Sequence, residues 1–315
     1  MDFVLDTEQR AYADSVRRLL ADGEPVKAAR AWAAGETGPG RELWRALAGT
    51  GLPALAVAEE LGGVGLRPAE LAAAFVELGR AGAPGPLVET VAVASVLGSE
   101  VASGAGEGVL LPGVLAGEAL VTVTDGPYAV DGHTADAVFA LDGDTLRHAG
   151  VTGPVRASLD PVRRLACCVA GEVVVGSEAS GLRPLAMLCA AAQALGVGRA
   201  LLDASVGYVG RRTQFGRPVG SFQAVKHRLA SVAMELEFAE PLLYGAAVAV
   251  GGRELPAAKL ACGRAAYGAA RAALQVHGAV GYADECDVGL WIRKARALRV
   301  AWGGAAECGA AVLGG

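Results

Sequence analysis

Hydrophobic positions along the first third of the chain recur with helical spacing. Thr7 and Glu8 are typical of a helix start, and Val16, Leu19 and Leu20 place the apolar residues of that helix on one face. Alanine-rich segments with the same period continue to about residue 115, separated by glycine and proline breaks. The pattern predicts a helical N-terminal region whose first helix is capped by Thr7.

The period of the pattern changes near residue 119. Residues 120–124 and 172–176 are rich in β-branched side chains, and the apolar segment 137–141 runs into Asp142-Gly143. Because Asp-Gly is a strong signal for a two-residue hairpin turn, a small β region is predicted here.

Helical spacing returns after Pro184. It extends over about 184–210, 221–250, 255–280 and 287–313, with glycine-containing breaks between the segments. The fold class is therefore α+β and mostly α. We expect an N-terminal helical domain at 1–117, a β domain at 118–180 and a C-terminal four-helix bundle at 181–315.

Composition supports a globular protein and argues against several function classes. Hydrophobic residues make up 53% of the 315 residues, and 28 basic against 33 acidic side chains give a net charge of −5. Without a basic block, binding to nucleic acid or to an anionic membrane is not expected. No signal peptide or long uncharged apolar run is visible, so a cytoplasmic protein is predicted.

Cysteine and histidine positions show no metal-binding pattern. The six cysteines lack ligand or disulfide spacing, which predicts buried free thiols, and the four histidines are scattered. We therefore expect no metal site.

The segment 211–223 carries the strongest chemical signal. Arg211, Arg212 and Arg217 lie between two predicted helices, where backbone amides and a helix N-terminus favour an anion such as a pyrophosphate. The alternative is an ordinary helical connection with solvated arginines.

This segment, Arg212-Thr213-Gln214-Phe215-Gly216 followed by Phe222-Gln223, resembles the flavin signature of acyl-CoA dehydrogenases. Two further stretches resemble the same family. The first runs from Gln275 through Gly278 and Gly281 to the Leu-Trp-Ile-Arg at 290–293, and the second is the N-terminal Ala-Glu-Glu-Leu-Gly-Gly-Val-Gly at 58–65. The resemblance implies an acyl-CoA dehydrogenase-like fold with a shortened middle β domain.

The resemblance also implies a set of cofactor-binding residues. In the family this region holds the ADP part of an FAD that is bound mainly by the neighbouring subunit. Arg212 would pair with the pyrophosphate, Gln214 and Phe215 would line the same groove, and Gln223 would lie near the adenine. The other two implied FAD contacts are Gln275 and Gly278, while His277 either faces the flavin or caps a helix.

Other positions depart from the family pattern. Trp302 occupies the position of the usual catalytic Glu, and the alternate base position falls at or near Ala186, in a segment without a carboxylate. Glu285 and Glu307 match neither base position. Residues 121–127 stand where the family has its flavin-ring-binding segment but lack that motif. We therefore assign no catalytic residue to this chain.

Taken together, the chain resembles the smaller, degenerate subunit of heteromeric α2β2 acyl-CoA dehydrogenases of actinobacterial sterol side-chain degradation. This implies an FAD shared with a second acyl-CoA dehydrogenase subunit, an acyl-CoA substrate oxidised to a 2-enoyl-CoA, and an electron-transfer flavoprotein as a candidate acceptor. Two alternatives stay open: a self-sufficient homotetramer with an unrecognised base, and a non-catalytic scaffold of the same fold. The particular acyl-CoA, the partner, flavin binding by the chain alone, and the roles of Trp302 and Glu307 stay open too.

Overall fold

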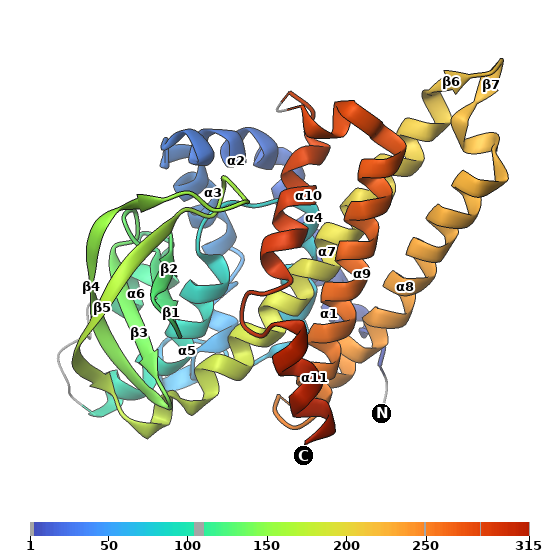
Figure 1. Ribbon diagram of the computed structural model, residues 1–315. Helices are drawn as coiled ribbons and strands as arrows, with labels where there is room; N and C mark the ends of the chain where they lie inside the picture. Colours follow the sequence, from blue (N-terminus) through green and yellow to red (C-terminus); the bar gives the residue numbers. More distant parts are fainter. Residues whose placement is uncertain (1–2, 104–109, 249, 284, 315) are drawn as a thin grey trace.

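Helices dominate the computed structural model, which describes residues 3–103, 110–248, 250–283 and 285–314 (Figure 1). A small sheet lies at one side of the molecule and the longest helices lie at the other. The N-terminal helices and 3-10 turns are α1 (Thr7–Asp22), α2 (Pro25–Ala34), α3 (Gly38–Ala48), η1 (Pro53–Ala56), η2 (Glu59–Leu61), α4 (Pro68–Ala81), α5 (Leu87–Ser103) and α6 (Leu110–Leu115).

The start of α1 differs from the predicted one by a residue. Asp6, and not Thr7, is the N-cap, because its carboxylate accepts the Gln9 N–H at 2.8 Å. The Gln9 side chain in turn accepts the Asp6 N–H at 3.0 Å, which completes a capping box. A capping box satisfies two amide donors that the first helical turn otherwise leaves free.

Helices α4 and α7 (Leu182–Arg211) touch through their backbones. A Cβ atom built on Gly79 would lie 2.1 Å from the Gln193 carbonyl oxygen, and one on Gly196 would lie 1.8 Å from that of Val76. Only glycine allows this approach. The two helices therefore pack closely at this contact.

A five-stranded sheet has the order β1-β3-β4-β5-β2 in the described residues. Strands β1 and β3 are parallel and the other pairs are antiparallel. The predicted hairpin at Asp142-Gly143 is confirmed, since Asp142 pairs with Thr145 across a two-residue turn. The strands are β1 (Val121–Thr124), β2 (Tyr128–Val130), β3 (Ala137–Asp142), β4 (Thr145–Arg156) and β5 (Leu165–Val175).

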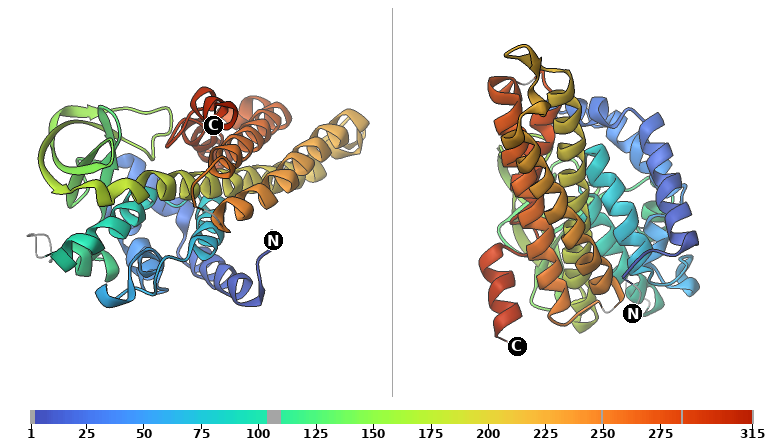
Figure 2. Two further views of the ribbon diagram at one scale, coloured as in Figure 1. Left: turned by 90° about the horizontal axis from the view of Figure 1, so that it is seen from below. Right: turned by 90° about the vertical axis from the view of Figure 1, so that its right-hand side faces the viewer.

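The C-terminal part is a bundle built around α7, which crosses the molecule from beside the sheet to the far tip (Figures 1 and 2). The prediction of a single helix at 287–313 is wrong. This segment forms two helices, because Trp302 and Gly303 between them have positive φ angles of 54° and 127° that a continuous helix does not allow. The further elements are η3 (Ser177–Gly181), β6 (Thr213–Gln214), β7 (Arg217–Pro218), η4 (Val219–Ser221), α8 (Gln223–Val248), α9 (Glu254–His277), η5 (Gly278–Tyr282), α10 (Val288–Leu298) and α11 (Ala305–Leu313).

Helix α7 explains the most apolar stretch of the chain. With η3 it is long and apolar enough to cross a membrane, but 78% of its apolar window is buried inside the protein. This is what a central core helix requires. It is the one candidate span found in the described part of the chain.

All six cysteines are free thiols. The expectation that they are buried holds for Cys189, Cys262 and Cys308 but is wrong for the other three. Cys167 and Cys168 on β5 and Cys286 near α10 are half-buried. Within the described ranges, no group of three or more His, Cys, Asp or Glu side chains could hold a metal ion.

Candidate functional site

The segment 211–223 forms a short hairpin that projects from the end of the bundle (Figure 1). Strands β6 and β7 are joined by Phe215 and Gly216, whose φ angles are 54° and 76°. A turn with two left-handed residues suits a tight hairpin, but such a conformation is unusual for an aromatic residue. Backbone strain of this kind persists where the surroundings hold it, and it is common at ligand-binding sites.

Aromatic contacts fix the hairpin while leaving its tip open. The Phe215 and Phe222 rings meet edge to face with centroids 6.1 Å apart, and the Arg217 guanidinium lies 4.1 Å from the centre of the Phe222 ring. Phe215 nevertheless remains 92% exposed. A contact that covered this ring would remove apolar area from water, so the tip is suited to bind a partner or a ligand.

The arginines of the hairpin are available to bind an anion. Arg212 follows the last residue of α7, and its N–H bonds to the Tyr208 carbonyl at 2.9 Å. Among the described residues, no carboxylate pairs with Arg211, Arg212 or Arg217. Guanidinium groups without an internal counter-ion fit a pyrophosphate, and the predicted ADP contacts therefore have suitable chemistry.

The second predicted segment lies at the same end of the bundle. His277 is buried at the end of α9, where its Nδ1 lies 2.8 Å from the Ala273 carbonyl oxygen. Its ring stacks on that of Tyr208 at 4.3 Å between centroids. Tyr208 therefore links the end of α9 to the start of the hairpin. Within the described chain His277 packs against Tyr208 at the end of α9.

Gln275 and Gly278 flank His277 and are both exposed. Gly278 ends α9 with φ 62° and ψ −140°, a conformation that is essentially restricted to glycine. No heavy atom lies within 4 Å of a Cβ atom built there. The backbone conformation requires this glycine, and the open space beside it leaves room for a ligand.

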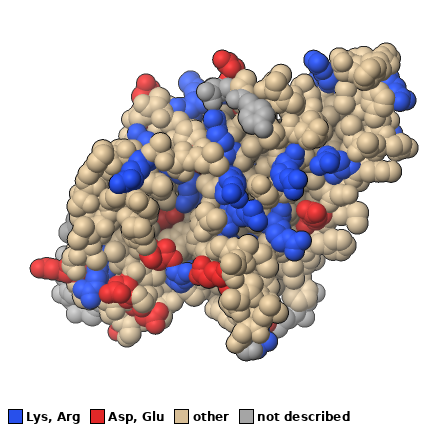
Figure 3. Space-filling model, in the orientation of Figure 1, with Lys and Arg blue, Asp and Glu red and all other residues tan. Residues whose placement is uncertain are grey.

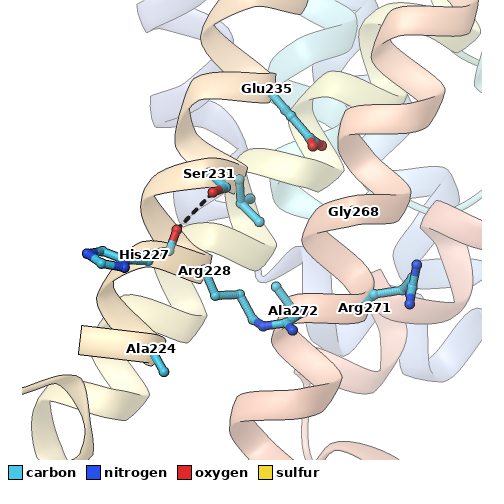
Figure 4. Close-up of a pocket in the computed structure, with 9 residues that line it drawn as sticks. Ala224, His227, Arg228, Ser231, Glu235, Gly268, Arg271 and Ala272 are labelled. Atoms are coloured by element: carbon cyan, nitrogen blue, oxygen red, sulfur yellow. Dashed lines mark hydrogen bonds between the residues drawn. The ribbon is translucent and has the colours of Figure 1, made fainter. Parts of the chain in front are cut away.

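A groove of about 430 Å³ between α8 and α9 extends from this end (Figure 4). It begins at Ala224, beside the exposed Gln223 that opens α8. Figure 4 shows Arg228 reaching across it toward Ala272, with Arg271 on the opposite helix. The groove is therefore open and basic along the side that the predicted ADP contacts share.

The turn between α10 and α11 is closed where the family has its catalytic Glu. Trp302 is only 7% exposed, and its Nε1 donates a hydrogen bond to Glu89 on α5 at 3.0 Å. The buried Lys259 fixes the same turn by donating to the Leu298 and Gly303 carbonyl oxygens, each at 3.0 Å. The indole has no basic group to offer.

Glu89 is the residue that sequence reasoning missed. It is 3% exposed, and the Arg163 guanidinium lies 3.9 Å from its Oε1. The sequence does carry a signal for this residue, because Glu89 is the one charged residue in the apolar stretch at 87–97. A lone carboxylate in such a helix has to find a partner when it is buried.

Other candidate carboxylates are occupied or distant. Glu307 and Asp125 both pair with Arg183, so Glu307 belongs to an ion-pair cluster. The first turn of α7 carries no acidic residue. Ala186, at the alternate base position, is a buried residue of the same helix. Glu285 is exposed near the start of α10. None of these groups replaces the missing base.

Three polar side chains near the β1–β2 turn are buried: Thr122, Thr124 and Asp131. The Thr124 hydroxyl donates to the Tyr128 carbonyl at 2.8 Å and accepts the Gly126 N–H at 3.1 Å, so it stabilises its own turn. Asp131, beyond the turn, is buried, and burial raises its pKa to about 6. Asp131 Oδ1 accepts the Arg164 N–H at 3.2 Å, while Asp131 Oδ2 and Thr122 Oγ1 are buried without a hydrogen-bond partner among the described residues. None of these described groups is exposed where it could bond to a flavin ring.

The β4–β5 loop closes the space between the sheet and the bundle. Asp160 of this loop pairs with Lys294 of α10 at 3.3 Å, and both side chains are buried. Arg163 of the same loop reaches Glu89, as described above. The loop therefore ties α5, α10 and the sheet together beside Trp302.

A larger cavity of about 700 Å³ lies between α5 and the start of α7. The described residues that line it include Glu59, Glu60 and Glu178 but no lysine or arginine. Three carboxylates without a cation would repel an anionic thioester, so this cavity does not suit a phosphate-bearing substrate.

Comparisons with known proteins agree with the fold and match both its N-terminal and its C-terminal helical parts. Residues 6–118 match the acyl-CoA dehydrogenase N-terminal domain, and residues 186–313 match the acyl-CoA dehydrogenase C-terminal domain. The chain is 31% identical over 294 residues to acyl-CoA dehydrogenase IpdE2 of Mycolicibacterium smegmatis, covering 92% of this chain and 93% of that protein.

Solved structures give the same result. The ChsE4-ChsE5 complex from Mycobacterium tuberculosis is similar with a TM-score of 0.81 and 25% identity, covering 98% of this chain and 96% of that chain. A variant of the Tcur3481-Tcur3483 steroid ACAD is similar with a TM-score of 0.80 and 24% identity, covering 98% and 97%. The latter identity supports similarity of fold alone.

Proposed function

Because this chain belongs to the acyl-CoA dehydrogenase family, as its similarity to relatives along nearly its full length shows, we propose that it is the cofactor-sharing subunit of a heteromeric enzyme. In this proposal a second subunit supplies the catalytic Glu and the flavin-ring pocket. This chain supplies the ADP-binding half of the same FAD site, through Arg212, Gln214, Phe215, Gln223, Gln275 and Gly278.

One observation carries the proposal: the turn at the base position is closed by the buried hydrogen bond between Trp302 and Glu89. A chain that catalysed alone would be expected to carry a carboxylate there or at the alternate position, where the buried Ala186 stands. At the other end of the bundle, the exposed arginines of the hairpin have no carboxylate partner in the described part of the chain, and Phe215 is 92% exposed. The catalytic end is closed while the cofactor-sharing end is open.

The tasks of this chain are binding and orientation. When bound, FAD accepts the β-hydride of an acyl-CoA whose α-proton a carboxylate has removed, which yields a 2-enoyl-CoA. Arg212 would neutralise the pyrophosphate, and Phe215 would cover the groove and exclude water. Gly278 would allow the backbone to approach the nucleotide without a Cβ atom.

An apolar stripe on α8 supports assembly with another subunit. Met234, Phe238 and Leu242 recur every four residues on one face of this helix and are all exposed. Such a stripe on a surface helix buries apolar area when another helix packs on it. A heterotetramer would cover it. A cytoplasmic location, a steroid side-chain thioester as substrate and an electron-transfer flavoprotein as acceptor belong to the same proposal.

Flavin content tests this proposal directly. The chain purified alone is expected to be colourless, because it has no ring pocket, and its complex with the partner is expected to hold about one FAD per two chains. Absorbance at the flavin maximum, divided by the concentration of each chain, measures both values. A yellow chain with about one flavin per copy would contradict the proposal.

A second candidate function rests on Glu89, whose carboxylate is buried beside the turn of the missing base. In a self-sufficient enzyme it would have to be the base, and Glu89→Gln would lower kcat by about 10²–10⁴-fold. Under our proposal the same variant, which keeps an acceptor for Trp302, should lower turnover of the complex by less than about tenfold. Stopped-flow reduction of the flavin by substrate separates the two.

A further inference from the structure

A concentrated basic face covers the outer side of α9 and α10 (Figure 3). Arg264, Tyr267 and Arg271 share one stripe of α9, because they are spaced by three and four residues. Arg296 and Arg299 of α10 lie against it: their guanidinium carbons are 5.5 and 4.6 Å from the centre of the Tyr267 ring. We call these four arginines and Tyr267 the arginine face.

The charges of the arginine face are not neutralised within the described chain. No described carboxylate pairs with Arg264, Arg271, Arg296 or Arg299, although the protein as a whole carries a net charge of −5. Glu235 reaches over Gly268 from α8 but lies more than 4 Å from these guanidinium groups. Two cations on one tyrosine ring repel each other unless an anion joins them.

A hollow of about 370 Å³ runs beside this face. Arg271 and Arg296 of the arginine face line it. They stand beside apolar side chains, among them Leu274, Ile292 and Leu159 of the β4–β5 loop. Leu274 directly precedes Gln275, and Gly281 of the hollow lies in η5, the turn that Gly278 opens. The arginine face is therefore continuous with the proposed cofactor-sharing surface.

We propose that the arginine face docks the second subunit through carboxylates that this subunit presents, and that its charge selects a heteromer over a homodimer. This inference rests on the proposed function. In a two-fold symmetric homodimer with this surface on the symmetry axis, the patch would meet its own copy, and arginine would face arginine. Like charges across an interface are costly, whereas an acidic partner gains ion pairs with planar, pre-organised guanidinium groups.

Charge reversal tests the docking role. The double variant Arg296→Glu/Arg299→Glu should weaken assembly with the flavin-bearing subunit by at least about tenfold, as expected for charges at an interface. Arg296→Lys/Arg299→Lys should retain most of the affinity, since it keeps the charge. Arg18→Glu on α1, an exposed arginine with no described ion pair, is the control and should leave assembly unchanged.

Titration of the two purified subunits by light scattering or calorimetry, at low and high salt, measures the effect. Wild-type affinity should fall as salt rises, and this dependence should be weaker for the double glutamate variant. If the double glutamate variant bound the second subunit as tightly as the wild type does, the docking role would be overturned, but the proposal of a shared FAD site would stand. Unchanged assembly combined with lost binding of ADP or coenzyme A would assign the face to a nucleotide and overturn the proposal. Failure of the wild-type chain to assemble with any flavin-bearing subunit would instead refute the proposed function.

Discussion

Replacing Lys294 by methionine should lower the free energy of unfolding by about 3–5 kcal/mol, the usual cost of removing one partner from a buried ion pair. Lys294 is buried on α10, and its Nζ lies 3.3 Å from Oδ2 of the fully buried Asp160. Without the ammonium group, the Asp160 carboxylate would keep only the Val162 N–H that bonds to its Oδ1 at 3.0 Å. Urea unfolding followed by circular dichroism measures the loss.

Two further variants show whether the effect comes from the unpaired charge. Lys294→Met/Asp160→Asn removes both charges while keeping an acceptor for Val162, so it should recover most of the lost stability. Lys27→Met breaks an exposed pair with Glu24 and should cost at most about 1 kcal/mol. If the single and double variants were equally unstable, the loss would come from packing and not from the buried charge.

Arg212→Ala should weaken flavin retention by the assembled enzyme by about ten- to hundredfold, because a charge-assisted hydrogen bond contributes about 1.5–3 kcal/mol. The arginine follows the end of α7, and no described carboxylate competes for it. Its loss should change FAD binding without unfolding the chain, since its side chain is exposed. Dialysis followed by flavin fluorescence gives the dissociation constant.

Two other variants serve as controls for Arg212→Ala. Arg212→Lys keeps the charge but not the planar two-pronged geometry, so it should retain only part of the affinity. Arg18→Ala, far along the chain on α1, should leave flavin binding unchanged. Equal retention by wild type and Arg212→Ala in the intact complex would mean that Arg212 is an ordinary solvated charge.

The order of the elements could be predicted because it depends on local signals. The helical spacing of apolar residues predicted the helices of the bundle, and the Asp142-Gly143 turn signal predicted the hairpin between β3 and β4. Strand β2 has only three residues and is held by pairing with β5, so its own sequence carries little signal. The break near Trp302 was missed because a bulky residue rarely adopts a positive φ.

The candidate site could be predicted only where it depends on short motifs. The resemblance named the hairpin and the end of α9, and the structure brings these to one end of the bundle through Tyr208 and His277. The hydrogen bond between Glu89 and Trp302 joins residues 213 positions apart, a separation that no local pattern reveals. The Asp160–Lys294 pair likewise connects the sheet to the bundle and depends on tertiary packing.

The exposed hairpin tip also affects how the chain must be produced in a cell. In the proposed heteromer, a second subunit would cover Phe215 at this tip and Phe238 on α8. Before assembly these rings would contact water, and each newly made copy would present them to chaperones and proteases. Copies synthesised in excess over that subunit should be retained by chaperones, precipitate or be degraded. The exposed apolar rings of this chain would therefore require that the two chains be made in balanced amounts, for instance from one shared transcript.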